Sequence, residues 1–486
     1  AYLNRTILRG EWQYDGVLVS DWASIEQMIA HGVCTNLRDA ASMAANAGVD
    51  IDMMGHAFSG HLVDLATSGA VDMKLVDAAV RRVLRLKLQL GLFANPYTKE
   101  PTETPYYHAD ALAAARACAT ESVILLKNNG ILPLGGEAKT IAVIGPLADA
   151  PADQLGTWVF DGEPDHSITP LTAIRQACGE SRRVIAEAGL AYSRDTDRDG
   201  ITRAVAAARE ADVILFFGGE EAILSGEAHS RADINLPGAQ TDLLAALEAT
   251  GKPIVTLVMS GRPNTLARET ELSDGLLLAL HGGTMAGPAL ADVIFGTAVP
   301  SGKLPITLPR MTGQIPVYHA HKASGRPAKD IVLIDDIPVG AGQTSLGCTS
   351  YHLDAGDSPL FPFGSGLSYT TFSYGPVELS SPTLEAGRGI IATCAITNTG
   401  TRDAMEIVQL YVRDIVGSLA RPVRELKGFD KISLKAGETK SVRFEITPET
   451  LAFWHADNTN HAEPGEFQIW IAPDSQSGQP AVFHLK

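Results

Sequence analysis

The sequence predicts a multidomain protein in which two α/β blocks precede an all-β block. In residues 1–320, short apolar runs alternate with amphipathic helical patterns, which is typical of sheets covered by helices. In residues 359–486, short strand-like segments recur with turns such as Asn398-Thr-Gly400, which indicates a β-sandwich of about seven strands. The length of 486 residues is sufficient for about three domains, each with its own core.

The composition is that of a globular protein, with 45% hydrophobic and 20% charged residues. The formal net charge of -17 argues against nucleic acid and anionic membrane as partners and suits a neutral ligand. No apolar run reaches the ~18–20 residues of a membrane span, and no signal-peptide pattern is visible. The five cysteines are scattered without zinc-ligand spacing, so we expect no metal and no cofactor.

Residues 1–100 form the first block, and two short apolar runs in it, at 15–20 and 47–54, predict strands. Helices are predicted at 36–46, 61–68 and 73–92. This order is typical of a parallel sheet or barrel. Two strands can neither close a barrel nor cover their own faces, so we expect the block to belong to a larger domain.

The first predicted strand ends at a carboxylate and an indole, Asp21 and Trp22. Reactive groups of α/β proteins lie just past the carboxyl ends of strands. Asp21 is therefore placed like a catalytic carboxylate, and Trp22 like a flat surface for a sugar ring. The pattern alone favours a more common role, in which Asp21 caps a following helix that contains Glu26.

The second block begins with residues 101–120, predicted as a Pro- and Thr-rich linker and a helix, and continues with an α/β sandwich domain at 121–320. Its strands are predicted at 140–145, 184–188, 212–218, 253–259, 275–280 and 304–308. Its helices are predicted at 199–211, 238–250 and 286–295. A polar loop at 219–238 follows an apolar strand, although polar loops are usually only solvated.

The last part of the chain is predicted as an irregular connection at 321–358 and an all-β domain at 359–486. Its clearest strands are predicted at 390–397, 406–412, 440–446 and 466–472.

Several motifs resemble those of glycoside hydrolase family 3, and they follow one another in the family's order. Gly16-Val-Leu-Val-Ser-Asp21-Trp22 resembles the nucleophile motif of the family. Ser225-Gly-Glu227-Ala-His229-Ser-Arg231-Ala-Asp233 resembles its acid/base loop. Pro300-Ser-Gly-Lys-Leu-Pro305 and Leu360-Phe-Pro-Phe-Gly364 are also similar. Taken together, the chain resembles the later part of the family's periplasmic β-glucosidases.

This resemblance implies that residues 1–100 are the C-terminal remnant of a (β/α)8 barrel, without most of the N-terminal barrel. It implies a fibronectin type III-like fold for residues 359–486. It further implies a retaining, exo-acting β-glucosidase that hydrolyses terminal non-reducing β-D-glucosyl residues by double displacement. In that reaction, Asp21 is the nucleophile and Glu227 the acid/base.

The resemblance also assigns supporting residues. Trp22 and Met54 would contact the sugar, although core packing is an equal explanation for Met54. Arg231, Asp233 and His229 would support the acid/base loop, and Glu220 and Glu221 are the next candidates for the acid.

Alternatives remain open at this point. The protein could be a β-xylosidase or another β-glycosidase of the family. An alternative from a different functional class is a catalytically inactive, truncated remnant that acts in binding or structure. The expected partners are a β-linked gluco-oligosaccharide or aryl glucoside and, because two strands leave an apolar face uncovered, a companion N-terminal barrel segment or a homodimer. The resemblance implies a periplasmic or secreted location.

Overall fold

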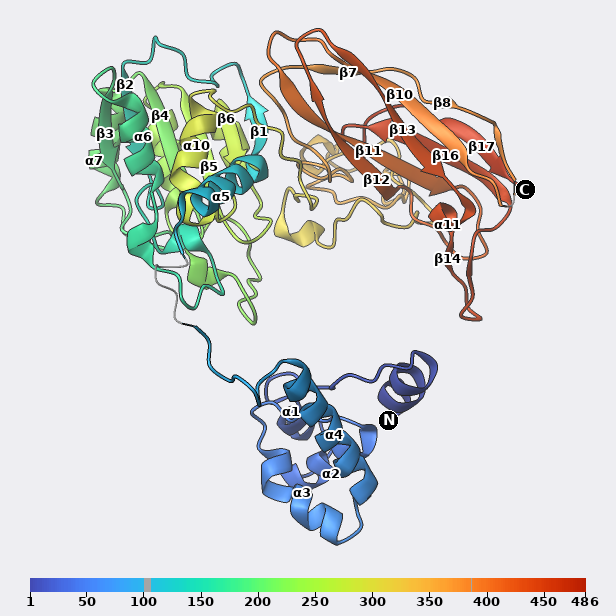
Figure 1. Cartoon of the computed structure of the whole chain (residues 1–486). Helices are drawn as coiled ribbons and strands as arrows, with labels where there is room; N and C mark the ends of the chain where they lie inside the picture. The colour runs from blue at the N-terminus through green and yellow to red at the C-terminus, as the bar shows by residue number, and fades with distance from the viewer. Residues whose placement is uncertain (100–105, 386) are drawn as a thin grey trace. The chain divides into compact units, whose positions relative to one another are not determined.

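The computed structural model describes residues 1–99, 106–385 and 387–486, and the chain divides into two compact units, residues 1–105 and 106–486 (Figure 1). Residues 100–105, which include part of the predicted linker, lie outside the described residues. No helix among the described residues combines the length and the apolar character needed to cross a membrane.

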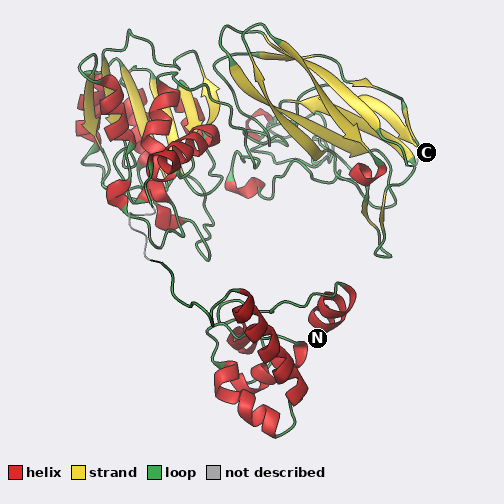
Figure 2. Ribbon diagram, viewed as in Figure 1, coloured by secondary structure: helices red, strands yellow, loops and turns green. Residues whose placement is uncertain are grey.

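The first unit is built of helices (Figure 2). In chain order they are η1 (Tyr2–Glu11), α1 (Ser24–Ala30), α2 (Leu37–Ala47), α3 (Ala57–Thr67) and α4 (Met73–Gln89). Helix α2 begins where the Asn36 side chain accepts a hydrogen bond from the Asp39 N–H, and it ends at Gly48, whose φ of 90° suits glycine. The core is small because many of its members are alanines of α2.

The two strands predicted in this unit are shorter than expected. Within residues 1–99, the runs at 15–20 and 47–54 form one parallel bridge, between Val19 and Ile51. The Ser20 N–H also donates to the Ile51 carbonyl at 2.9 Å. An isolated pair of strands is only marginally stable without further strands beside it, so the pairing does not extend.

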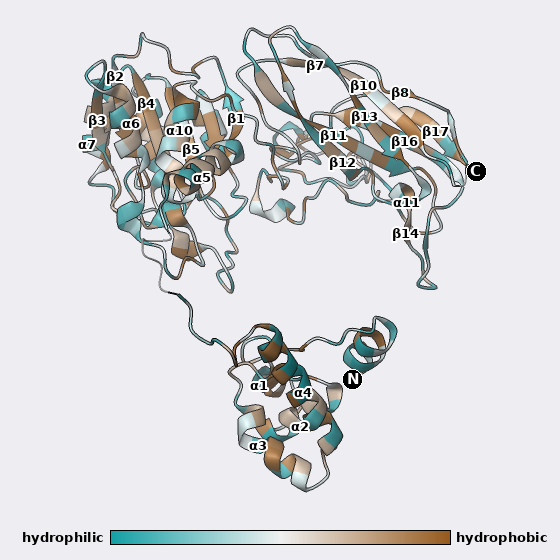
Figure 3. Ribbon diagram, in the orientation of Figure 1, coloured by the Kyte–Doolittle hydropathy of each residue, from teal (hydrophilic) through white to brown (hydrophobic). Residues whose placement is uncertain are grey.

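The second unit contains a six-stranded sheet with the order β1-β6-β5-β4-β2-β3. The strands are β1 (Ile124–Asn128), β2 (Thr140–Ile144), β3 (Arg183–Glu187), β4 (Val213–Gly219), β5 (Ile254–Met259) and β6 (Gly275–Leu278). Strand β1 pairs antiparallel with β6, and the other pairs are parallel. Strands β4 and β5 are buried along their whole length and hydrophobic (Figure 3), as expected for a sheet covered on both faces.

Helices cover both faces of this sheet. Helices α6 (Pro170–Cys178) and α10 (Ala286–Ile294) pack in one hydrophobic core, and α7 (Ile201–Arg209) and α8 (Gln240–Glu248) pack in another. Helices α5 (Ala109–Ser122) and α9 (Ala267–Leu272) complete the set of longer helices.

One strand predicted in this domain is wrong. Residues 304–308 form no strand, and Leu308 makes only an isolated bridge with Phe361. Pro305 and Pro309 flank the segment, and proline has no N–H to donate to a ladder.

The C-terminal part of the second unit is an all-β sandwich, so the predicted fold class is confirmed. One sheet contains β7 (Phe372–Tyr374), β8 (Glu378–Leu379), β10 (Ile390–Asn398) and β13 (Thr439–Ile446). The other has the order β12-β11-β16-β17-β9, with β12 (Glu425–Leu434), β11 (Ala404–Asp414), β16 (Gly465–Ala472), β17 (Ala481–Leu485) and β9 (Thr383–Leu384). Short elements α11 (Pro448–Leu451), β14 (Phe453–Trp454) and β15 (Asn460–His461) lie between β13 and β16.

Candidate active site

Asp21 lies directly after the bridge between Val19 and Ile51, and its side chain is exposed. Its Oδ1 accepts a hydrogen bond of 2.7 Å from the Trp22 N–H, whereas its Oδ2 has no partner among the described residues. Helix α1 begins at Ser24 after Ala23 and has no side-chain cap. The alternative role of Asp21 as a helix cap is therefore wrong, and its carboxylate is exposed.

The two predicted sugar contacts in this unit are also accessible. Trp22 is 61% exposed and Met54 is 52% exposed. Met54 has a left-handed φ of 61°, which is uncommon for a residue with a long side chain. Because its side chain is largely exposed, Met54 does not belong to the core of this unit.

A buried carboxylate that was not predicted from the sequence fixes the backbone before Asp21. The side chain of Asp50 is 1% exposed and forms ion pairs with Arg9 at 2.8 Å and Arg82 at 2.6 Å. It also accepts the Leu18 N–H at 2.9 Å. A buried charge with this many partners holds the neighbouring backbone in place. The signal in the sequence was an aspartate inside the apolar run Val49-Asp50-Ile51.

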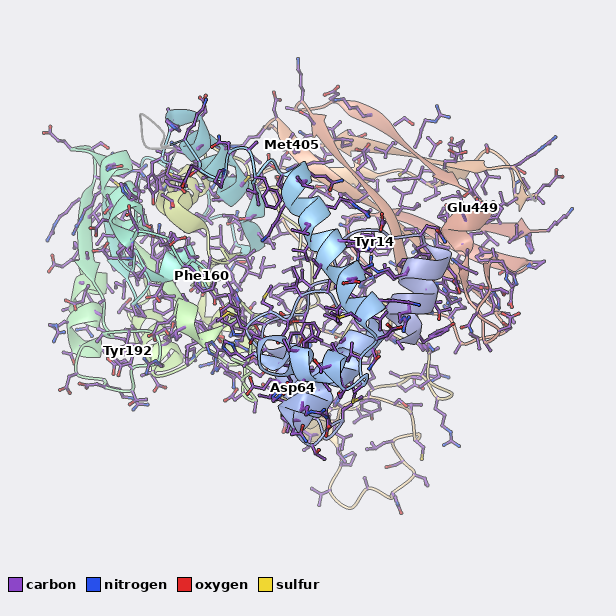
Figure 4. The ribbon with its side chains drawn as sticks, turned by 60° about the horizontal axis from the view of Figure 1, so that its bottom comes forward. Tyr14, Asp64, Phe160, Tyr192, Met405 and Glu449 are labelled. Atoms are coloured by element: carbon purple, nitrogen blue, oxygen red, sulfur yellow. The ribbon has the colours of Figure 1, made fainter. Side chains whose placement is uncertain are left out.

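Glu227 lies in the loop after β4, on the wall of an open pocket of about 710 Å³. Its exposed carboxylate forms no hydrogen bond or ion pair with any described residue. Two aromatic side chains that the sequence analysis missed, Trp158 and Phe160, line the same pocket. They are 59% and 82% exposed, and their rings meet edge to face at 5.5 Å. Figure 4 labels Phe160, which comes from the segment after β2.

The loop that carries Glu227 is anchored at Glu220, whose side chain is 0% exposed. Arg231 is paired with Glu220 Oε1, and the Arg262 Nε donates to Oε2 at 2.7 Å. The Asn264 Nδ2 donates to Oε1 at 2.9 Å. Arg262 also donates to the backbone carbonyls of Leu224 and His229. We call Glu220, Arg231, Arg262 and Asn264 the loop clamp.

The other predicted loop residues make local contacts. His229 Nδ1 lies 3.2 Å from the Ser225 carbonyl, and Asp233 accepts the Asn235 N–H at 3.0 Å. Glu221 accepts from the Ser193 hydroxyl at 2.8 Å and is paired with Arg194. Glu220 and Glu221 are both paired with arginines, whereas the Glu227 carboxylate is the one in this loop without a partner among the described residues.

A further carboxyl lies on the wall of the Glu227 pocket. Asp153 accepts the Ala222 N–H at 3.0 Å, which ties it to the start of the loop that carries Glu227. Burial raises the pKa of Asp153 above its usual value, and the charge of Glu221 adds to this effect. Within the described residues, no group of three or more His, Cys, Asp or Glu side chains is arranged to hold a metal ion.

Comparison with known proteins gives three matches along the chain. Residues 1–86 match the Glycosyl hydrolase family 3 N terminal domain, residues 123–369 the family 3 C-terminal domain, and residues 406–475 a Fibronectin type III-like domain. Among curated relatives, a periplasmic β-glucosidase of Salmonella typhimurium is 39% identical over 100% of this chain and 65% of its own length. A β-xylosidase of Formosa agariphila is 34% identical over 98% of this chain and 65% of its own length.

Solved structures agree with these matches. A β-glucosidase from Listeria innocua, solved in complexes that include glucose and laminaribiose, superposes with a TM-score of 0.90 at 36% identity over 100% of this chain and 66% of that chain. A β-glucosidase involved in saponin metabolism from intestinal bacteria gives a TM-score of 0.88 at 32% identity over 100% of this chain and 69% of that chain. The chain thus spans 65% of the length of the curated relatives named above. On these matches, the chain belongs to glycosyl hydrolase family 3.

Proposed function

We propose that the protein acts as a retaining, exo-acting β-glucosidase that releases terminal non-reducing β-D-glucosyl residues. One observation carries the proposal: the unpaired carboxylate of Glu227 faces a pocket with exposed aromatic side chains, on a loop held by buried ion pairs. Exposed aromatic faces and a free carboxyl are what a sugar ring and its glycosidic oxygen require.

In the proposed reaction, the Asp21 carboxylate attacks the anomeric carbon while the glycosidic bond to the leaving oxygen breaks. Glu227 gives its proton to that oxygen, and the glucosyl group is then esterified to Asp21. Water next attacks the anomeric carbon, Glu227 takes its proton, and Asp21 leaves as a carboxylate. Trp22 and Met54 serve as sugar contacts, and Arg231, Asp233 and His229 hold the acid/base loop.

The second candidate substrate is a β-xyloside, because two relatives from Formosa agariphila are named as a β-xylosidase and a putative β-xylosidase. Xylose lacks the hydroxymethyl group of glucose, so the two sugars are separated by contacts to that group. The ratio of kcat/KM for 4-nitrophenyl β-D-glucoside and β-D-xyloside decides between them.

We also propose that the first unit is covered by a companion barrel segment or by a second copy of the chain. Val80, Leu84 and Leu88 lie one turn apart on α4 and are 49%, 43% and 64% exposed. An apolar stripe of this kind on a helix is normally buried. The name of the Salmonella relative supports a periplasmic or secreted location.

The test is the intact mass before and after incubation with 2-deoxy-2-fluoro-β-D-glucosyl fluoride, which traps a retaining nucleophile. We expect a gain of one fluoroglucosyl group on the peptide that contains Asp21, and no gain in Asp21→Asn. No trapping in a folded protein of 51.5 kDa without a companion would instead support the inactive remnant.

A further inference from the structure

The five-stranded sheet of the β-sandwich has an outer face, on the side away from the sandwich core. Along β11, Leu410 and Val412 point into the sandwich core, so Tyr411 and Arg413 point to the opposite face. Trp470 of β16 is directly opposite Tyr411 in the antiparallel register. This outer face therefore carries two buried aromatic rings, those of Tyr411 and Trp470, beside Arg413, and these rings are covered from solvent.

Two segments from outside the sandwich pack over this face. The His319 ring stacks on Phe363 at 4.1 Å and meets Tyr411 edge to face at 6.1 Å. The Gln409 Nε2, on the same face of β11 as Tyr411, donates to the Gly364 carbonyl at 3.1 Å. The packing leaves a pocket of about 320 Å³, within the size range of small-molecule sites.

Two guanidinium groups line this pocket. Arg424 lies over the Trp470 ring at 4.2 Å, and its Nη1 donates to the Ser477 carbonyl at 2.9 Å. Arg413 is half-buried and forms no hydrogen bond or ion pair with any described residue. Neither arginine has an acidic partner within ion-pair distance among the described residues.

The nearby acidic groups are engaged elsewhere or exposed. Asp474 accepts the N–H groups of Gln476 and Ser477, and Glu425 is paired with Arg421 at 2.7 Å. Asp357 lines the pocket but is exposed. The lining of this pocket thus carries two guanidinium groups against one carboxylate, on a chain of net charge -17.

We propose that this pocket binds a small polyhydroxylated carboxylate, for which a hexuronate is the simplest probe. Guanidinium groups bind carboxylates through paired hydrogen bonds that an ammonium cannot make. Thr307, Ser475 and Gln476 line the same pocket and offer partners for hydroxyl groups. Tyr318, 58% exposed at the rim, offers a face on which a sugar ring stacks. The proposal is independent of the catalytic roles of Asp21 and Glu227.

The experiment is calorimetric titration of the full chain with D-glucuronate, D-glucose and acetate. We expect saturable binding of glucuronate that weakens roughly tenfold or more in Arg413→Gln. Arg443→Gln is the matched control, because Arg443 is exposed on β13 of the other sheet and the change in charge is the same. Glucose, which lacks the carboxylate, is expected to bind no differently in the two variants.

Tyr318→Ala provides a second variant, because the exposed rim position tolerates truncation without unfolding. It is expected to weaken glucuronate binding severalfold while leaving the thermal midpoint unchanged. Absence of glucuronate binding, or equal binding by wild type, Arg413→Gln and Tyr318→Ala, overturns the proposal. Acetate binding as tight as glucuronate binding also overturns it, because the pocket would then recognise only a charge.

Discussion

The loop clamp places a fully buried carboxylate, Glu220, between two arginines from different segments of the chain. Arg231 belongs to the motif that pointed to the acid/base loop, whereas Arg262 is 42 residues from Glu220 and was not identified. No spacing rule predicts that pairing, because it depends on β4 and β5 ending side by side in the sheet. The sequence motif therefore indicated the loop that carries Glu227, whereas the residues that hold this loop in place are determined by the fold.

Arg262→Ala is expected to loosen the loop and to destabilise the protein by about 1.5–3 kcal/mol, because the buried carboxylate keeps Arg231 and Asn264 but loses one charged partner. Loose placement of Glu227 should lower kcat/KM for glucosides with poor leaving groups by roughly tenfold or more. Activated 2,4-dinitrophenyl glucosides need little protonation, so their kcat/KM, which reports only the glycosylation step, should be almost unchanged. The measurement is kcat/KM across a leaving-group series, together with urea unfolding.

Arg268→Ala is the control for this substitution, since Arg268 is exposed and its one ion pair with a described residue is the exposed pair with Glu271. An equal loss of kcat/KM for good and poor leaving groups in Arg262→Ala would contradict a role in placing the acid.

Asp153→Asn is expected to stabilise the protein near pH 8. The folded-state pKa of Asp153 lies above its ordinary value of 3.8, so the protonated form is favoured in the folded state. Protonated Asp153 therefore contributes to the free energy of unfolding. This contribution is complete at pH values below the pKa of Asp153 in the unfolded state, and it is lost as the pH rises through its pKa in the folded state. An Asn keeps an oxygen for the Ala222 N–H but carries no charge.

The measurement is the thermal midpoint of wild type and Asp153→Asn at pH 8 and at a pH below 3.8. The gain should be present at pH 8 and should vanish in acid, where wild-type Asp153 is also neutral. A gain of equal size at both values would rule out the carboxylate charge as its cause.

At the scale of elements, strands that are buried on both faces of a sheet were predictable from the sequence. Strands β4 and β5 are apolar throughout because helices cover both faces, and the predictions at 212–218 and 253–259 are close to their bounds. Strand β12 was not predicted, because its residues are mostly half-exposed and include Lys427, Asp430 and Lys431. The run before Asp21 has the right residues for a strand but no sheet within its own unit to extend the pairing.

Gly219→Ala tests the end of β4. Gly219 has a φ of 134°, and a Cβ there would overlap the Met259 carbonyl on β5. We expect a marked loss of stability and of glucosidase activity together, because Glu220 follows directly. Urea unfolding measures the first effect. Gly136→Ala is the control, since a Cβ at Gly136 meets no atom within 4 Å. A similar loss of stability in Gly136→Ala would show that the effect of Gly219→Ala does not come from the overlap with the Met259 carbonyl.

At the scale of the whole molecule, the two units differ in how well they bury their own surfaces. The second unit has closed cores on both sides of its sheet, whereas the first leaves the apolar stripe of α4 exposed. The strand count predicted an uncovered apolar face, because two strands cannot cover their own faces. The exposed stripe lies on helix α4, however, and not on those two runs, which form a single bridge.

Leu84→Glu is expected to weaken association of the chain with a second copy or a companion segment while leaving the helix content unchanged, because Leu84 is 43% exposed within the unit. Sedimentation velocity of wild type should give a mass above 51.5 kDa, and Leu84→Glu should shift it towards that value. Leu88→Gln, which adds no charge, should have a smaller effect. A wild-type mass of 51.5 kDa at all concentrations would contradict the proposed association.

The buried Asp50 also determines how the first unit opens. Arg9 comes from η1, Leu18 from the segment before Asp21, and Arg82 from α4, yet all three donate to one carboxylate. If any one of these segments detaches, the buried Asp50 carboxylate loses a donor that compensates its charge. We therefore expect the three segments to open together, as a single cooperative unit. In amide hydrogen–deuterium exchange, the Leu18 N–H should therefore exchange at the same slow rate as the middle of α4, although Leu18 lies in no regular element. The backbone that leads to Asp21 would then unfold only when the whole first unit unfolds.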